Sequence, residues 1–139
     1  MKTLALIVGL LLTGIAVNAQ NEEGFTLTVT IENVLSDDGH VLASLHTNET
    51  FMRGPGILNA TKKSNKGALT LTFENVQPGT YAILAMQDAN DNQRMDFDEN
   101  GMPKESFGMS GNDMTMGPPN FESAKFEVTD SAKEFKIRF

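Results

Sequence analysis

The sequence predicts an all-β fold, an antiparallel β-sandwich of about seven strands with an immunoglobulin-like or prealbumin-like arrangement. Three observations lead to this prediction. Apolar residues alternate with polar ones over several short segments, which is the pattern of half-buried strands. Clusters of Gly, Pro, Asp and Asn separate these segments, and no stretch of useful length has the period of an amphipathic helix.

The first two strands follow from strict alternation. The stretch FTLTVTIENV (residues 25–34) places apolar side chains on one face and threonines on the other. After the turn residues SDDG (36–39), the stretch HVLASLHT (40–47) resumes the alternation. Because only a short turn separates the two strands, the sequence predicts that they pair as a hairpin.

The middle of the chain predicts two further strands. Residues 48–66 have no period and are expected to form loops. The stretch ALTLTFENV (68–76) alternates again, and QPGT (77–80) turns the chain. The stretch YAILAMQD (81–88) is apolar on both faces, as expected of a central strand that is covered on both sides.

A long loop and two final strands complete the predicted domain. Residues 88–120 carry most of the methionines among Gly, Pro, Asp and Asn, without a sustained period. A loop of this length is usually either functional or disordered. The stretches AKFEV (124–128) and KEFKIRF (133–139) have the apolar stripes of strands.

The N-terminus predicts export from the cytoplasm. Residues 1–19 contain Lys2, an apolar run too short for a membrane span, and Val17-Asn18-Ala19 before the expected cleavage point. We expect removal of this signal peptide to leave residues 20–139 as a single β-sandwich domain without a membrane span. The sequence has no cysteine, which excludes disulfides, a catalytic thiol and a cysteine-based zinc site.

The net charge of −7 limits the classes of partner. Loss of Lys2 with the signal peptide would make the charge one unit more negative. An acidic domain is not expected to bind nucleic acid or an anionic membrane surface, whereas cations are suitable ligands.

The stretch QDANDNQRMDFDEN (87–100) has the oxygen spacing of a calcium loop. Counted from Asp88, side-chain oxygens stand at loop positions one, three, five, nine and twelve, and a backbone carbonyl is expected at position seven. Outside the cytoplasm even a weak calcium site would be occupied. The candidate metal ligands are Asp88, Asn90, Asn92, Arg94 through its carbonyl, Asp96 and Glu99, with Asp98 as a substitute for Glu99.

A polar turn without a metal is the alternative interpretation. Asp and Asn also occur in ordinary turns, where their side chains bond to nearby backbone groups. Position six of a calcium loop is normally glycine, because the backbone turns sharply there, but this sequence has Gln93. A left-handed conformation at that residue would cost on the order of 1 kcal/mol.

The methionines of the long loop give a second candidate site. Thioether ligands select Cu(I), and four methionines lie between residues 102 and 116 of this polar, Gly-rich segment. The alternative is that they fill gaps where the loop packs on the sandwich. The candidate copper ligands are Met102, Met109, Met114 and Met116.

Catalytic motifs are not evident, so the sequence predicts a protein that is not an enzyme. Ser106 and Ser110 lack the context of a nucleophile elbow. His40 and His46 share one strand face but lie about 20 Å apart at the usual rise per residue, so they cannot bind one metal together. A hydrolase of unspecified substrate is the third functional hypothesis.

The segments QPGTYAILAMQDANDNQRMD, GMPKESFGMSGN and GPPNFESAKFEV resemble a widespread bacterial family of exported proteins, the domain-of-unknown-function family 2141. The resemblance covers roughly residues 25–139. It implies a transthyretin-type or immunoglobulin-like sandwich, located in the periplasm or outside the cell of a bacterium, and implies no particular activity. Its most specific parts are Pro78-Gly79-Thr80-Tyr81, Pro103-Lys104-Glu105, Phe107-Gly108 and Gly117-Pro118-Pro119-x-Phe121.

The acidic turn departs from the family pattern, which commonly reads His-Asp-x-Asn-Gly-Asn-Gly. Here Gln87 stands for the histidine, Asp91 for the first glycine and Gln93 for the second. The leading expectation is a non-enzymatic binding or accessory module that holds a protein or small-molecule ligand through a calcium-stabilised loop. A periplasmic copper-handling protein is the runner-up.

Overall fold

The computed structural model describes residues 23–112 and 118–139. The expected signal peptide and two of the candidate copper ligands, Met114 and Met116, lie outside these residues. The elements are β1 (Phe25–Val34), β2 (His40–His46), β3 (Leu58–Lys63), β4 (Gly67–Val76), β5 (Gly79–Asp88), β6 (Phe107–Met109), α1 (Phe121–Ala124), β7 (Phe126–Val128) and β8 (Lys133–Arg138).

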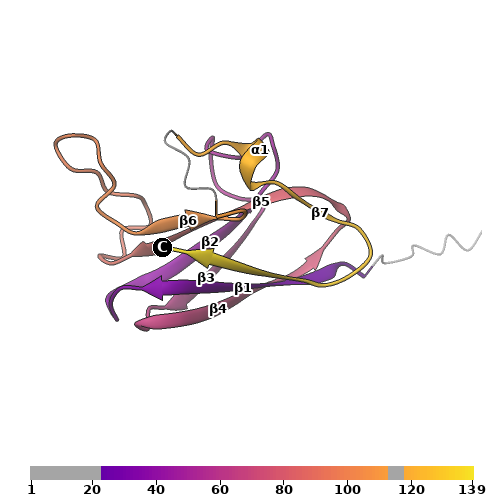
Figure 1. Cartoon of the computed structure of the whole chain (residues 1–139), viewed down its shortest axis with the longest axis horizontal. Helices are drawn as coiled ribbons and strands as arrows, with labels where there is room; N and C mark the ends of the chain where they lie inside the picture. The colour runs from indigo at the N-terminus through magenta and orange to yellow at the C-terminus, as the bar shows by residue number, and fades with distance from the viewer. Residues whose placement is uncertain (1–22, 113–117) are drawn as a thin grey trace, which may run out of the picture.

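Two sheets face each other, which confirms the predicted β-sandwich (Figure 1). The smaller sheet has the order β4-β1-β8, and the larger one has the order β3-β2-β5-β6, with β7 pairing with β5. All pairs are antiparallel except β1 with β8. Within the described residues, no helix has the length and apolar character needed to span a membrane.

The core lies between the sheets and contains the side chains that the alternation assigned to one face. The inward residues of β1 and β5 are fully buried because each strand has neighbours on both sides and the opposite sheet above it. Tyr81 at the start of β5 is also buried in this core. The largest fully buried apolar side chains are Leu27, Val29, Ile31, Val34, Val41, Leu45, Val76, Ile83, Val128 and Ile137.

The predicted hairpin of the first two strands is wrong. β1 pairs with β4 and β8, whereas β2 pairs with β3 and β5, so the 35–39 segment carries the chain from one sheet to the other. Buried Gln87 holds this crossing segment by donating to the carbonyls of Ser36 and Asp38 and accepting from the N–H of Leu35. The alternation correctly gave the buried face of each strand but not its partner.

Two short strands lie where the sequence predicted only loops. β3 has the sequence LNATKK, whose exposed lysines obscure the inward-facing Leu58 and Ala60. Charged residues on an edge strand hinder pairing with a second chain, so an edge strand often lacks a clear apolar pattern. β6 has three residues, which is too short for any period to be recognised. It divides the predicted 88–120 loop.

A second, smaller apolar cluster lies outside the sandwich, beneath α1. Its buried members are Phe51, Ala82, Met109 and Ala124. Ser110 links β5 to α1 beside this cluster. Its hydroxyl accepts from the N–H of Ile83 at 2.9 Å and donates to the carbonyl of Ala124 at 2.6 Å. This cluster fixes one end of the outer face of the larger sheet.

Candidate functional site

The acidic loop begins at Asp88, the last residue of β5. This carboxylate is only 1% exposed and accepts the backbone N–H groups of Asn92 at 3.1 Å and Gln93 at 2.7 Å. Gln93 has a φ of 62°, which is the left-handed conformation expected at position six of a calcium loop. Asp88 therefore reverses the chain immediately after the strand, and its two hydrogen bonds offset the strain at Gln93.

Two further predicted ligands, Asn90 and Asn92, both bond to the carboxylate of a third, Asp96. Asp96 accepts the side-chain amide of Asn90 at 2.6 Å and that of Asn92 at 2.9 and 3.0 Å. These two amides hold the pKa of Asp96 below its usual value, because they stabilise the ionised form. The structure thus brings together Asp88, Asn90, Asn92 and Asp96.

Glu105, which the sequence did not single out as a ligand, lies beside the acidic cluster, and the ligand role of Glu99 stays a prediction. The two carboxylate oxygens of Glu105 accept the N–H groups of Ala89 and Asp96, each at 3.2 Å. Glu99 is exposed and makes no side-chain hydrogen bond or ion pair within the described residues. Asp98 instead closes its own turn by accepting from the N–H groups of Asn100 and Met102.

The spacing of residues along the sequence could not identify Glu105 as a neighbour of the acidic cluster, because residues 97–103 fold outward as a small loop. Phe97 and Pro103 form an isolated β-bridge at its base, so the chain returns to the cluster only afterwards. The sole sequence signal was the position of Glu105 in the Pro103-Lys104-Glu105 segment of the family resemblance.

The side chains of the acidic cluster are hydrogen-bonded to one another and to nearby backbone groups. Within residues 23–112 and 118–139, no group of three His, Asp or Glu side chains is arranged as metal ligands. The oxygen atoms suit calcium in kind, and rotation of the Asn90 and Asn92 amides would turn two more oxygens toward Asp96. The backbone N–H of Arg94 donates to Asn92, and the ligand role of its carbonyl stays a prediction.

A hydrogen bond between two side chains ties the acidic loop back to the sheet. Nδ1 of His40, on β2, lies 2.6 Å from a carboxylate oxygen of Asp91. His40 and His46 project from the face of β2 opposite the core, as the alternation predicted, and both line the same groove.

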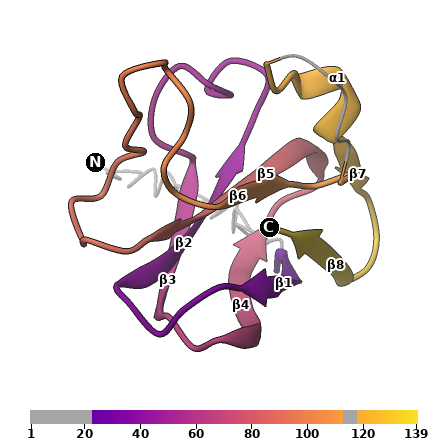
Figure 2. The same cartoon turned by 60° about the vertical axis from the view of Figure 1, so that its left-hand side comes forward.

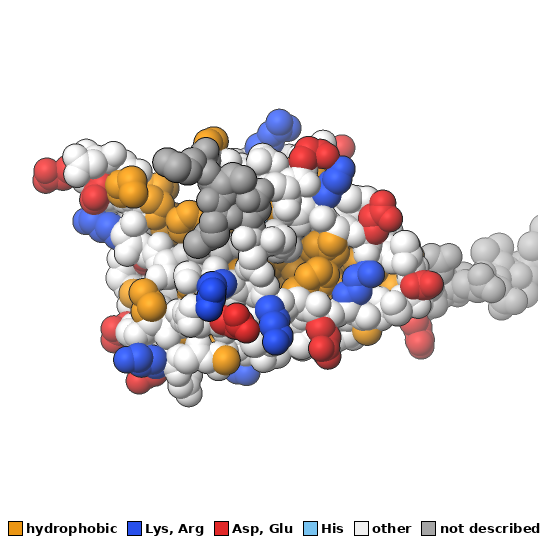
Figure 3. All heavy atoms as spheres, viewed as in Figure 1, with side chains coloured by type: hydrophobic (Ala, Val, Ile, Leu, Met, Phe, Trp, Pro, Cys, Tyr) orange, Lys and Arg blue, Asp and Glu red, His pale blue; other side chains and the backbone are white. Residues whose placement is uncertain are grey.

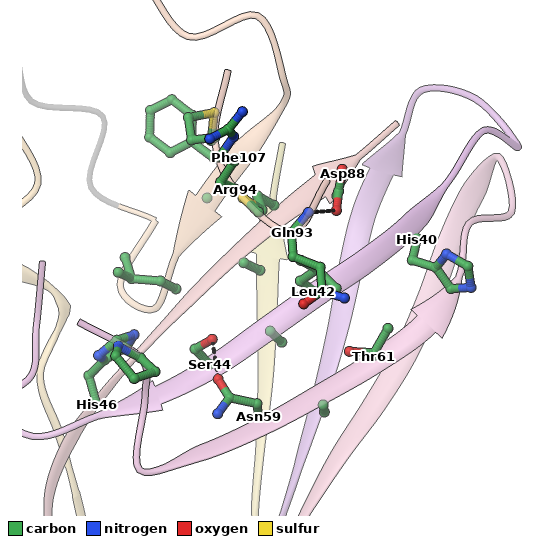
Figure 4. A pocket seen from close by; sticks show the side chains of 18 of the residues that line it. His40, Leu42, Ser44, His46, Asn59, Thr61, Asp88, Gln93, Arg94 and Phe107 are labelled. Carbon is green, nitrogen blue, oxygen red and sulfur yellow. Dashed lines mark hydrogen bonds between the residues drawn. The ribbon is translucent and has the colours of Figure 1, made fainter. Parts of the chain in front are cut away.

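This groove, of about 1390 Å³, runs along the outer face of the larger sheet. One row across its floor comes from Thr61, Leu42, Met86 and Phe107, which are register partners on β3, β2, β5 and β6. A second row comes from Asn59, Ser44 and Leu84. The floor is therefore apolar toward β5 and β6 and polar toward β3 (Figure 4).

Two loops form the walls of the groove. The β2–β3 connection and the loop between β5 and β6 rise on the same side of the larger sheet (Figure 2). Hydrophobic side chains gather on the surface near the second loop (Figure 3). Met52, Phe97 and Phe107, which line the groove, are 59%, 57% and 43% exposed. Apolar side chains that stay exposed around a concavity are typical of a binding site.

Most of the ionisable side chains that line the groove already have hydrogen-bond partners. The carboxylate of Asp88 is buried and hydrogen-bonded, and Asp91 is paired with His40. Burial lowers the pKa of His46, although a hydrogen bond to the carbonyl of Thr50 opposes this effect. Arg94 differs: it lines the groove and forms no ion pair within the described residues, although its charge helps to lower the pKa of the nearby Asp96.

The candidate copper ligands do not share one environment. Met109 is buried in the cluster beneath α1, whereas Met102 is 63% exposed beyond the acidic turn. The other two candidates lie outside the described residues, so copper binding stays a prediction. The Ser110 hydroxyl is likewise buried and serves to join β5, β6 and α1.

The comparisons with known proteins give one positive result. The chain matches, over residues 29–136, a protein family described as "Uncharacterized protein conserved in bacteria (DUF2141)". No curated protein and no solved structure matches the chain.

Proposed function

The chain belongs to the DUF2141 family of bacterial proteins, and from this premise we propose that it is an exported, non-enzymatic binding module whose ligand lies in the groove on the outer face of the larger sheet. The observation that carries the proposal is the groove itself. It is large enough for a small molecule, and its apolar side chains remain exposed.

The mechanism is that of a rigid scaffold with shaped loops. β2 and β5 are central strands whose inner faces are fixed by the core, so their outer side chains form a floor that does not need to reorganise on binding. The loops supply the walls, and a preformed site reduces the entropy cost of binding.

Calcium is the proposed stabiliser of the second wall. Asp96, Asn90 and Asn92 would supply oxygen ligands, with Glu105 beside them. A bound cation would offset the repulsion between the carboxylates of this loop. The ion would thereby hold the loop, including Arg94 and Phe97, over the groove.

The groove is tested by binding of the uncharged fluorescent dye N-phenyl-1-naphthylamine. We expect the purified protein to enhance its fluorescence in a saturable manner. Leu42→Asn should weaken dye binding roughly tenfold, because it removes an apolar side chain from the floor.

Leu35→Asn is the matched control, since Leu35 is 63% exposed and does not line the groove. Equal dye affinities in the two variants would contradict the assignment of the groove, provided that both melt near the temperature of the wild type.

The calcium hypothesis is tested by thermal melting in chelator and in millimolar calcium or magnesium. We expect calcium alone to raise the melting temperature, by about 5 °C for a binding contribution near 1 kcal/mol. Asp96→Ala should abolish the rise and Glu105→Gln should reduce it. Glu99→Gln should leave it intact because Glu99 lies away from the cluster. A rise lost in Glu99→Gln but kept in Glu105→Gln would refute this ligand set.

A further inference from the structure

We propose that the natural occupant of the groove is a small molecule with an aliphatic body and one carboxylate, and that Arg94 binds this carboxylate. This inference rests on the proposed function of the groove and specifies the chemistry of the ligand. The inference rests on three features of the groove: an apolar floor, an exposed arginine on the wall that forms no ion pair within the described residues, and a sheet face without free backbone groups.

The charge argument depends on which groups remain unpaired. Among the residues that the structure describes, five ionisable side chains line the groove. Asp88 is buried with hydrogen bonds to both carboxylate oxygens, and the carboxylate of Asp91 is hydrogen-bonded to His40. Burial favours the neutral form of His46. Arg94 differs from these groups: it is exposed and forms no ion pair within the described residues, and it acts on Asp96 only through its charge, so its N–H groups are free to bind a ligand.

A guanidinium in this position suits a carboxylate. It presents two parallel N–H groups that match the two oxygens of a carboxylate, and such charge-assisted pairs are stronger than neutral hydrogen bonds. Arg94 and Phe107 both line the groove, so the charged head of a ligand would lie at the same wall as an apolar surface for its body.

The floor provides room for an extended aliphatic chain. The groove follows β2 from His40 to His46, which is about 20 Å at the usual rise per residue. Leu42, Leu84 and Met86 form its apolar side, and Met95 and Pro103 add to the wall. An aliphatic chain can lie on these side chains without leaving any polar group unsatisfied.

A peptide is less suitable as the occupant. The backbone N–H and C=O groups of β2 and β5 are directed toward their neighbours within the sheet and are used there. A peptide lying on this face would therefore bury its own backbone groups against apolar side chains, at a cost of a few kcal/mol for each unsatisfied group. A sugar is also poorly matched, because the sequence has no Trp and its single Tyr, Tyr81, belongs to the core.

The test compares three amphiphiles with the same chain as competitors of N-phenyl-1-naphthylamine. Dodecanoate, dodecanol and dodecylammonium are titrated below their micelle concentrations at about 0.15 M salt, which screens the overall negative charge of the protein. We expect dodecanoate to displace the dye at a concentration roughly tenfold below that of dodecanol, with dodecylammonium the weakest.

Arg94→Gln should remove the advantage of dodecanoate and leave the affinity for dodecanol unchanged. Arg138→Gln is the matched control, because it removes the same charge outside the groove and should preserve the advantage. Equal displacement by dodecanoate and dodecanol, or an advantage that survives in Arg94→Gln, would overturn the inference while the proposed function stands.

Failure of the proposed function gives a different result. If the wild-type protein does not bind the dye and none of the three amphiphiles binds in direct calorimetry, both the groove proposal and this inference fail. A dimer in sedimentation that Leu42→Asn dissociates would assign the groove to a second copy of the chain and would also overturn the inference.

Discussion

Replacing Gly39 with alanine is expected to destabilise the protein by about 3–5 kcal/mol. Gly39 has a φ of 60° and lies where the crossing segment enters β2. An added Cβ would lie 1.8 Å from the carbonyl oxygen of Asp88 and 2.8 Å from two backbone atoms of Ala89. Backbone atoms cannot move aside as a flexible side chain can, so the end of β5 would have to separate from β2. Urea denaturation monitored by circular dichroism measures the loss.

Gly101→Ala isolates the conformational part of this effect. Gly101 also has a positive φ, 78°, but no atom lies within 4 Å of an added Cβ. This variant should lose only about 1 kcal/mol. If Gly39→Ala and Gly101→Ala cost the same, the packing of Gly39 against the end of β5 does not contribute to stability.

Asp88→Ala is expected to destabilise the protein by about 2–4 kcal/mol, because it leaves the N–H groups of Asn92 and Gln93 without their acceptor. The effect should be large because Asp88 is 1% exposed, so water cannot replace the lost carboxylate. Denaturant unfolding in chelator measures this contribution separately from any bound cation.

Asp98→Ala shows whether the loss of stability depends on burial of the carboxylate or only on the number of hydrogen bonds that are lost. Asp98 also accepts two backbone N–H groups, from Asn100 and Met102, but these bonds are exposed. Its loss should cost less than about 1 kcal/mol, since solvent can satisfy the freed donors. Equal losses in Asp88→Ala and Asp98→Ala would contradict the anchoring role of Asp88. In dye binding, Asp88→Ala should weaken affinity because the wall of the groove is no longer held.

Sequence and structure agree wherever local pattern decides the outcome. Alternation identified the buried faces of β1, β2 and β4, and the apolar run of β5 correctly indicated a central strand. The spacing of Asp88, Asn90, Asn92 and Asp96 indicated that these side chains converge. The left-handed conformation at Gln93, whose cost counted against a calcium loop in the sequence, is present in the structure.

Prediction failed where the outcome depends on distant segments. The choice of β4 and β8 as partners of β1 depends on burying two apolar faces against each other, and several pairings satisfy the same alternation. Glu105 reaches the acidic cluster only because residues 97–103 fold outward and return. The spacing of residues in a calcium loop does not allow for such an insertion.

The sequence alone therefore determined the sandwich class, the faces of its main strands and the acidic reversal after β5, since these depend on residues close together in the chain. The tertiary structure alone decided which strands pair, which carboxylate completes the cluster and how the groove forms. Leu42, Met86, Phe107 and Thr61 come from four different strands, and Arg94 comes from a loop. Only the register of the assembled sheet places them around one cavity.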